Sequence, residues 1–420
     1  MVTGTGICPK ESADSLRAGS ELDPEHAFAI RRRMVLDGFK WDPQVGDATT
    51  IAPFPIIIPA AQWQELSNLA EKLASELAAA EAELLGRPGL HRHLGLPRRL
   101  RRVLSRACEL SLTPAAARVL RFDFHLTHEG WRISEVNSDV PGGFTEASNL
   151  PAMTTRYYPG TRIAGDPAAA WADAIGATAV GPDIGLLAAT GFMEDQQIMA
   201  YLASLLARRG FVPHLVGLHD LVWRNNLAYL QSRMHFGPLG AIVRFYQAEW
   251  LAASSPRYAW PKLFVGGQTP VANPATAALV ESKRFPLVWN QLKTALPMWR
   301  ALLPETRDPR DAPWAREESW LVKSAMCSTG DTVAIREFLT PKQWQRVCRD
   351  VRWRPGWCVA QRRFTSIPLD TPAGKVYPCL GVYTINSRAC GIYGRFSKKP
   401  LIDFAAIDVA VLVEEPRHEW

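Results

Sequence analysis

The sequence predicts a mixed α/β protein, and three observations support that class. Residues 62–85 (QWQELSNLAEKLASELAAAEAELL) place leucines at helical spacing along one face. Residues 184–216 run from an apolar strand through a helix into a second extended segment, which is a βαβ pattern. Residues 320–397 contain short apolar runs that are typical of strands. The fold class is therefore α/β (α+β), divided into about two or three domains at this length.

The bulk composition is that of an ordinary globular chain, with 47% hydrophobic and 21% charged residues among 420. Its 48 basic and 41 acidic residues leave a formal charge of +7, which fits either simple solubility or an anionic partner such as a nucleotide. The basic residues are spread along the chain, and the densest cluster, residues 98–102, equally fits a solvated helix face. We expect no nucleic-acid partner.

Seven cysteines are scattered without a CxxC or a zinc-type spacing, which favours reduced thiols and a cytoplasmic location. The first residues, MVTGTGICPKESADS, have no apolar core of a signal peptide. No apolar run approaches the ~18 residues of a membrane span, so no membrane partner is expected. The oligomeric state is left open.

The first half of the chain is expected to form three units. Residues 1–110 are mainly helical, because helix 62–85 ends at Gly86 and a second helix is predicted over 97–110. Residues 111–165 contain a strand hairpin over 118–137. Residues 166–250 form a small α/β lobe, whose Gly191 lacks the GxGxxG spacing of a dinucleotide site.

Residues 251–420 form the fourth unit. A connection rich in Pro, Ala and Gly leads to a helix over 281–296, kinked or started near Pro286, and then to a polar linker over 306–319. Strands are predicted at WLVK, TVAI, WCVAQRRF, CLGVYTIN and GIYGRFS, with a helix at PKQWQRVCRDV among them.

The hairpin RFDFHLTHEGWRISEVNSDVPGG (121–143) carries polar side chains where a core face would be apolar. A three-residue turn at 128–130 would end on glycine, a common hairpin geometry. Thr127 would then face Trp131, and the pairing would bring Arg121, Asp123, Glu135 and Asn137 onto one side of the sheet. A two-residue turn would shift the register by one and separate Asp123 from Glu135.

Two directly opposed carboxylates repel each other, so something must offset Asp123 and Glu135. Mg²⁺ prefers oxygen ligands such as these carboxylates and the amide oxygen of Asn137. A solvated ionic face with Arg121, or an acid/base carboxylate pair, are the alternatives.

A second feature points to an anion. In VKSAMCSTGDTV (322–333), Lys323 ends a predicted strand before a loop of small residues whose N–H groups could face an anion. The GxxxxGK[ST] order of a Walker loop is missing. An ordinary hairpin with an exposed lysine is the alternative reading.

Taken together, the chain resembles the glutathionylspermidine synthase-like branch of the ATP-grasp superfamily over roughly residues 25–413. RFD followed by EVNSDVPGGFTEA is similar to the R-x-D and E-x-N-A-D pattern of that family. In most ATP-grasp enzymes E-x-N follows the lysine lobe, whereas here it precedes Lys323, as in this permuted branch. Similar segments follow in the family's order: FYQAEW, ESKRFPLVW, LVK with Gly330, WCVAQRRF, and GIYGRFS with KKPLID.

The resemblance implies an ATP-grasp fold in permuted order, with a small pre-ATP-grasp-like α/β lobe and an N-terminal helical segment. It implies a ligase that uses ATP and Mg²⁺ to join a small carboxylate (an amino acid or short peptide) to an amine through an acyl phosphate. The implied metal ligands are Asp123, Glu135 and Asn137. Arg121 would contact the transferred phosphoryl group. The implied nucleotide contacts are Lys283, Lys323, Gly330, Gln361 and Arg395.

Glu249 and Glu146 are candidates for recognising or deprotonating a cationic amine, with plain salt bridges as the alternative. The phosphate loop departs from the usual Lys-Pro and Gly-Arg-x-Gly, reading Cys327-Ser328-Thr329-Gly330 after Lys323-Ser324. Residues 140–143 (VPGG) replace the serine-containing stretch of glutathione users, so a different acid and amine are expected. An inactive nucleotide-binding homologue, or a metal- or polyanion-binding protein without nucleotide, remain the alternatives.

Overall fold

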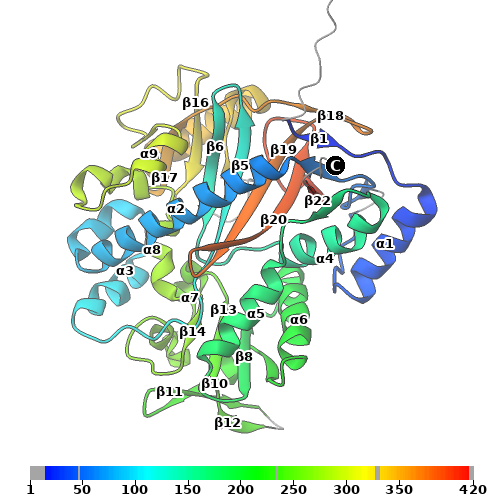
Figure 1. Cartoon of the computed structure of the whole chain (residues 1–420). Helices are drawn as coiled ribbons and strands as arrows, with labels where there is room; N and C mark the ends of the chain where they lie inside the picture. Colours follow the sequence, from blue (N-terminus) through cyan, green and yellow to red (C-terminus); the bar gives the residue numbers. More distant parts are fainter. Residues whose placement is uncertain (1–14, 46–47, 233–234, 327–331, 416–420) are drawn as a thin grey trace, which may run out of the picture.

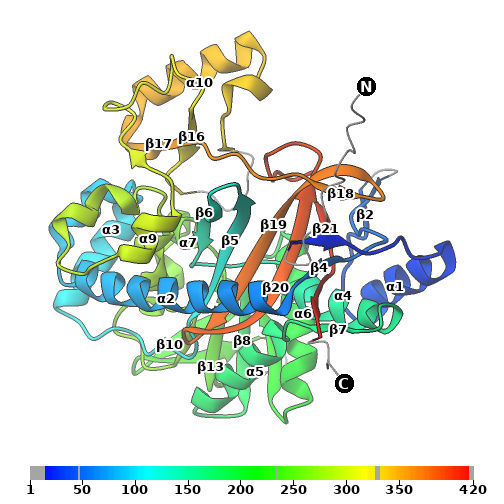
Figure 2. The same ribbon diagram turned by 45° about the horizontal axis from the view of Figure 1, so that its top comes forward.

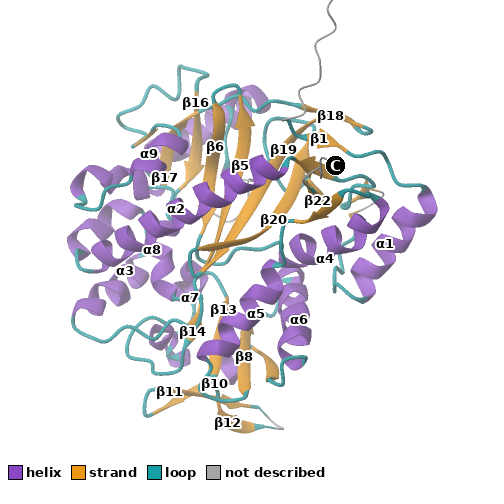
Figure 3. Ribbon diagram, viewed as in Figure 1, coloured by secondary structure: helices purple, strands orange, loops and turns teal. Residues whose placement is uncertain are grey.

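The computed structural model describes residues 15–45, 48–232, 235–326 and 332–415 of the chain. It has the predicted mixed α/β architecture, built around one large sheet (Figure 1, Figure 3). That sheet joins a hairpin from the first third of the chain to strands near its end. Its strands follow the order β21 (Ile407–Val409), β20 (Arg388–Ser397), β19 (Gly374–Ile385), β5 (Val119–Thr127) and β6 (Gly130–Asn137), with β18 (Leu369–Thr371) paired to β19.

The two faces of this sheet differ in chemistry. Helix α2 (Ala60–Leu85) crosses one face (Figure 1), and its buried leucines join Phe122 and Phe124 of β5 in one hydrophobic core. The helix predicted over 62–85 is thereby confirmed, and it ends where Gly86 follows. The opposite face carries the polar side chains of β5, β19 and β20, several of them buried.

A smaller sheet contains strands from near both ends of the described chain. Its order is β1 (Arg17–Ala18), β4 (Ile56–Ile58), β22 (Val411–Glu414) and β7 (Thr161–Ile163). Nearby lie α1 (Pro24–Leu36), α4 (Phe144–Thr154) and β2 (Gln44–Val45), which pairs with β3 (Ala48–Thr49) (Figure 2). Helix α1 starts at Pro24 because the Asp23 carboxylate accepts a hydrogen bond from the His26 N–H at 2.9 Å.

The predicted βαβ pattern is confirmed as a small α/β lobe. Its parallel sheet has the order β14 (Val271–Ala272), β13 (Ala241–Phe245), β8 (Asp183–Ala188) and β9 (Val212–Val216). The lobe's helices are α5 (Pro167–Thr178) and α6 (Met193–Ala207). A three-stranded antiparallel sheet at the far end of the lobe (Figure 1) contains β10 (Leu221–Arg224), β11 (Leu227–Gln231) and β12 (Phe236–Pro238).

The last layer stands apart above the large sheet (Figure 2). It holds β15 (Thr306–Arg307), β17 (Cys358–Arg362), β16 (Trp320–Ser324) and helix α10 (Pro341–Trp353). Thr340 caps α10 and exchanges hydrogen bonds with Gln343, which explains where this predicted helix starts. The strand predicted at TVAI (332–335) is wrong, because only Ala334 pairs there, as a single bridge to Val322.

The helix predicted over 281–296, kinked or started near Pro286, forms only in part and as a 3₁₀ helix. Helix α8 (Ala278–Glu281) stops there, since Ser282 turns to an extended conformation and the Lys283 N–H donates to the Ala325 carbonyl at 2.8 Å. A 3₁₀ helix then covers Phe285–Gln291. The remaining helices are α3 (Arg98–Ser105), which is shorter than the predicted 97–110, α7 (Ala248–Ala253) and α9 (Pro297–Leu302).

None of the helices over residues 15–415, gaps excepted, is both long and apolar enough to span a membrane. The division into four units at residues 110, 165 and 250 stays a prediction. Strand pairing joins each of the first three units to the fourth, because β4 of the first pairs with β22, β5 of the second with β19, and β13 of the third with β14.

Candidate functional site

The β5–β6 hairpin brings Asp123 opposite Glu135 and Arg121 opposite Asn137, as the sequence predicts. The reason given for that pairing is wrong. Thr127 pairs with Gly130 and not with Trp131, so the turn has only two residues between the paired positions. A bulge at Ser134, between the Phe124–Ile133 and Asp123–Glu135 pairs, then restores the register. The shorter turn shifts the strand register by one residue and the bulge shifts it back, so Asp123 still pairs with Glu135.

Asp123 is the centre of a buried charge cluster. Its carboxylate accepts two hydrogen bonds from Arg121, at 2.8 and 3.1 Å, and one from Arg395 of β20 at 2.8 Å. The Asn137 side-chain amide donates to the same carboxylate at 3.3 Å. Both guanidinium groups also lie near the Tyr393 ring, with Cζ of Arg121 and of Arg395 at 5.3 and 5.0 Å from the ring centre. Both cations are therefore fixed in position by the sheet.

Gly381 of β19 makes room for Arg121, and its replacement by alanine is our first prediction. An added Cβ would lie 2.8 Å from Arg121 Cδ, so we expect Gly381→Ala to displace Arg121 from Asp123 and to lower the free energy of unfolding by about 1–3 kcal/mol. Urea unfolding followed by tryptophan fluorescence measures this. Gly89→Ala is the matched control, because nothing lies within 4 Å of its added Cβ. Equal stability of the two variants would contradict the packing argument.

Glu135 meets two lysines that come from distant parts of the chain. Lys283 Nζ lies 3.3 Å from Glu135 Oε2 and 3.2 Å from Glu281 Oε1. Lys323 Nζ donates to the Ser134 carbonyl at 2.9 Å. Glu281 in turn accepts from the Ser138 and Asp139 N–H groups at 2.6 and 3.1 Å. The hairpin, the turn that carries Lys283 and the strand that carries Lys323 therefore meet near Glu135.

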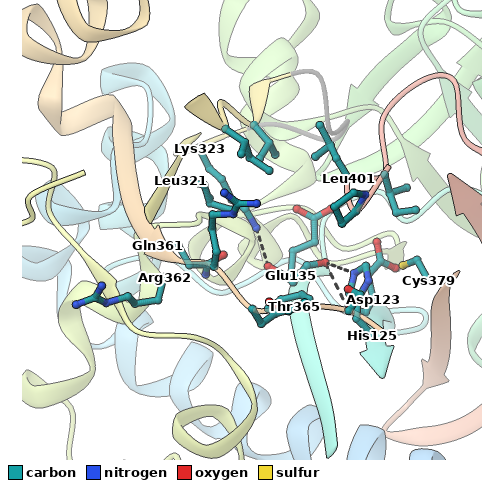
Figure 4. A pocket seen from close by; sticks show the side chains of 18 of the residues that line it. Asp123, His125, Glu135, Leu321, Lys323, Gln361, Arg362, Thr365, Cys379 and Leu401 are labelled. Carbon is teal, nitrogen blue, oxygen red and sulfur yellow. Dashed lines mark hydrogen bonds between the residues drawn. The ribbon is translucent and has the colours of Figure 1, made fainter. Parts of the chain in front are cut away.

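An open cavity lies beside this convergence (Figure 4). Asp123, Glu135, Lys323 and Gln361 line it from four different strands. Its apolar lining comes from two separate stretches of the chain, namely Leu321, Val333 and Ile335 from one and Pro400, Leu401 and Ile402 from the other. Gln361 also donates to the Thr306 hydroxyl at 3.0 Å, which holds it at the wall. Such a cavity suits a ligand with a flat apolar end and an anionic end.

Burial and neighbouring charge set the ionisation of the cluster. Burial raises the pKa of Asp123, but Arg121 and Arg395 outweigh it and hold the pKa below its usual range. Burial likewise raises the pKa of Glu135, and Lys283 and Lys323 lower it further than burial raises it. Both carboxylates are therefore ionised at neutral pH. Burial lowers the pKa of His125 to about 4, so that imidazole is neutral there.

The donor set at the hairpin fits a hard divalent cation. Asp123, Glu135 and Asn137 offer two carboxylates and an amide oxygen from facing positions of one sheet face, and Mg²⁺ takes such oxygens together with substrate phosphates. The Asn137 amide nitrogen points at Asp123, which leaves its oxygen for another partner. The residues therefore fit Mg²⁺ in the chemistry of their oxygen atoms and in their facing positions on the sheet.

The two glutamates proposed from the sequence lie in different surroundings. Glu249 is half-buried at the start of α7, and burial, with Asp139 and Glu281, raises its pKa to about 7. Glu146 of α4 is buried, and the Lys40 ammonium donates to it at 2.7 Å. Lys40 also contacts Asp42 and Asp408 at 3.1 and 3.0 Å. Glu146 thus forms the salt bridge that was considered as the alternative to amine recognition. Its role in binding the amine stays a prediction.

Some site residues were missed by the sequence reasoning. His125 and Cys379 line the cavity, and Gly381 and Tyr393 shape the arginine cluster. His125 and Tyr393 did have a signal, because they continue the period-two alternation of the strands that carry Asp123 and Arg395. Cys379 and Gly381 had none, because they lie on β19, where no site residue was predicted. Gly330 and the rest of the loop 327–331 lie outside the described residues, so their predicted phosphate contacts are not described.

Comparisons with known proteins agree with this fold. The sequence model described as "Glutathionylspermidine synthase preATP-grasp" matches residues 31–413. A glutathione synthetase-like effector from Globodera pallida, solved in its apo form, superposes with a TM-score of 0.61 at 12% identity, over 93% of this chain and 98% of its own. A putative gamma-glutamylcysteine synthetase from Methylobacillus flagellatus gives a TM-score of 0.39 at 12% identity, over 77% and 87%. No curated protein matches the sequence.

Proposed function

We propose that this chain, which belongs to the glutathionylspermidine synthase preATP-grasp family, is an ATP-dependent carboxylate–amine ligase. The observation that carries the proposal is one cavity lined both by apolar side chains, such as Leu321 and Leu401, and by the charged groups of Asp123, Glu135 and Lys323. In this proposal the adenine ring would lie between Leu321 and Leu401, near the strand that carries Gln361. The triphosphate then extends toward Lys323 and Lys283.

The charge of the site supports an anionic ligand. The cations Arg121, Arg395, Lys283 and Lys323 outnumber the carboxylates Asp123, Glu135 and Glu281 by one. A nucleotide triphosphate brings more negative charge than this surplus offsets, so a divalent cation belongs in the complex. Asp123, Glu135 and Asn137 would hold Mg²⁺, which when bound neutralises phosphate charge and orients the phosphates.

The chain's own residues would act by positioning and by charge. Arg121, held by Asp123 and by the Gly142 carbonyl at 2.7 Å, would bind the phosphoryl group as a carboxylate oxygen of the acid attacks the γ-phosphorus and ADP leaves. Lys283 and Lys323 would stabilise the charge on the phosphates. The amine nitrogen then attacks the carbonyl carbon of the acyl phosphate, inorganic phosphate leaves, and the amine loses a proton.

Glu249 is the group that we assign to the amine. Asp139 accepts the Ala248 N–H at 2.7 Å at the start of α7, and Asp139, Glu281 and Lys283 are the charged groups that act on Glu249. An ionised Glu249 could bind an ammonium group or accept its proton.

The pH dependence of kcat/KM for the amine tests this role. The pKa of Glu249 is raised to about 7, so the carboxylate is mostly neutral at pH 6 and mostly ionised at pH 8. We expect kcat/KM for the amine to rise through pH 7 in the native enzyme. In Glu249→Gln that rise should be lost, while kcat/KM for ATP changes little. The exposed Glu318→Gln is the control, and an unchanged profile in Glu249→Gln would remove this residue from the amine site.

The substrates are proposed as a small acid, such as an amino acid or short peptide, and an amine. Release of ADP and phosphate should be measured across pools of amino acids, peptides and polyamines with Mg²⁺ present. Turnover that needs both an acid and an amine supports the ligase. Tight ATP binding without turnover under every pairing would instead identify an inactive nucleotide-binding homologue. A thermal shift that needs both Mg²⁺ and ATP would exclude a metal-binding protein without nucleotide.

A further inference from the structure

We propose that the small α/β lobe carries a second metal site, of the zinc class, formed by Asp183, His214 and His235. Asp183 opens β8, His214 lies in β9, and His235 directly precedes β12. A metal ion on these three residues would fasten the antiparallel sheet β10–β12 to the parallel sheet of the lobe. The site belongs to a different sheet from the nucleotide cavity, and it does not depend on the proposed ligase activity.

The register of the parallel sheet brings the first two ligands onto one face. Gly185 pairs with His214, and Asp183 lies two residues before Gly185 on β8, so all three positions face the same way. That face is covered by the antiparallel sheet's connection, because an added Cβ at Gly185 would lie 2.8 Å from Leu239 Cδ1. The side chains of Asp183 and His214 therefore lie on the sheet face that is covered by the segment containing His235.

The distances suit a small ion after a modest adjustment. Asp183 Oδ1 lies 2.7 Å from His214 Nε2 and 3.7 Å from His235 Nε2. One ligand atom from each residue lies within 4.8 Å of the others. Tetrahedral zinc, with bonds of about 2.0–2.1 Å, separates its ligand atoms by about 3.4 Å. Two imidazole nitrogens with one carboxylate are a donor set that zinc accepts.

Two further observations separate this cluster from a simple Asp–His hydrogen bond. The Nε2 atom of His235 is buried and has no hydrogen-bond partner, although it faces a carboxylate. Gly237 leaves the space that the ring occupies, since an added Cβ would lie 2.9 Å from His235 Nε2. His235 is also anchored, because its N–H donates to the Ser232 hydroxyl at 3.0 Å. A buried ring nitrogen that is held in place without a hydrogen-bond partner needs an explanation, and a bound metal ion would supply one.

Zinc binding to the full-length chain, freed of any histidine tag, tests the proposal. Competition against a chromogenic chelator gives stoichiometry and affinity, and cobalt substitution reports the geometry. We expect one Zn²⁺ per chain. His214→Ala and His235→Ala should each weaken binding by more than the about 10- to 100-fold that loss of an outer-shell partner costs. His219→Ala, an exposed histidine of the same lobe, is the matched control and should bind zinc normally.

Gly237→Ala is a second probe that leaves all three ligands in place. Its added Cβ should push the His235 ring away and weaken zinc binding without changing the other ligands. Zinc should also raise the melting temperature of the native chain but not that of His235→Ala. The proposal is overturned if the native chain binds no zinc at one-to-one stoichiometry, or if His214→Ala and His235→Ala both bind as tightly as His219→Ala.

Discussion

Glu135→Gln is expected to abolish ligase activity while leaving the fold intact. The amide keeps the shape of the side chain but removes the negative charge that we assign to Mg²⁺. We expect kcat to fall by roughly 10²- to 10³-fold or more, the cost of losing one electrostatic contact to the transition state. Stability should hardly change, because Glu135 is not fully buried and Lys283 keeps Glu281 as a partner at 3.2 Å. ADP release with saturating substrates measures the first effect, and urea unfolding measures the second.

Glu129→Gln is the matched control, because Glu129 sits at the turn of the same hairpin with its side chain 77% exposed. It should turn over like the native enzyme. Normal turnover by Glu135→Gln would make the metal assignment wrong. A Glu135→Gln variant that is inactive but also unfolded would contradict the statement that Lys283 remains paired.

Lys40→Met is expected to have the largest effect on stability. Lys40 is buried and contacts Glu146, Asp408 and Asp42 at 2.7, 3.0 and 3.1 Å. Methionine fills similar space but leaves Glu146 and Asp408 buried without their cation. Breaking a buried ion pair in this way costs about 3–5 kcal/mol. The free energy of unfolding at pH 8, from urea titration, is the measurement, with the exposed Lys72→Met as the matched control.

The loss should shrink as the pH falls. Burial lowers the pKa of Lys40, but the three carboxylates raise it well above its usual value. A raised lysine pKa contributes stability that is present at all pH values below the unfolded-state pKa, so the Lys40 ammonium stays charged from pH 5 to 8. In the variant, Glu146 loses the cation that counteracts the rise of its pKa by burial and Asp408. It then takes up a proton as the pH falls, which relieves the repulsion.

The same variant distinguishes the two roles considered for Glu146. If Glu146 serves mainly as the partner of Lys40, a folded fraction of Lys40→Met should retain its KM for the amine. A large rise in that KM, with stability equal to that of Lys72→Met, would instead support amine recognition by Glu146.

The fold class and the polar face of the hairpin were predictable because both follow from periodicity. The leucines at helical spacing predicted α2, and alternation on β5 predicted that Arg121 and Asp123 share a face. The bulge at Ser134 was not predictable, since a serine fits either strand face. The turn length was inferred from Gly130, which does have a positive φ of 94° but pairs with Thr127. The correct pairing of Asp123 with Glu135 thus rested on two compensating errors.

Other parts of the site depend on contacts between distant segments. The turn at Lys283 exists because its N–H donates to the Ala325 carbonyl, some forty residues later in the chain. Local propensity therefore included Lys283 in a predicted helix, with a break or start only near Pro286. The Lys40 cluster and the Asp183–His214–His235 cluster likewise form only when separate elements pack together. The roles assigned to the individual site residues remain predictions.

A crystal structure with Mg²⁺ and a non-hydrolysable ATP analogue tests the central claim most directly. We predict the adenine between Leu321 and Leu401, the triphosphate against Lys283 and Lys323, and Mg²⁺ on Asp123, Glu135 and Asn137. A nucleotide bound elsewhere on the chain, or one bound in this cavity with no metal on Asp123 or Glu135, would contradict the account.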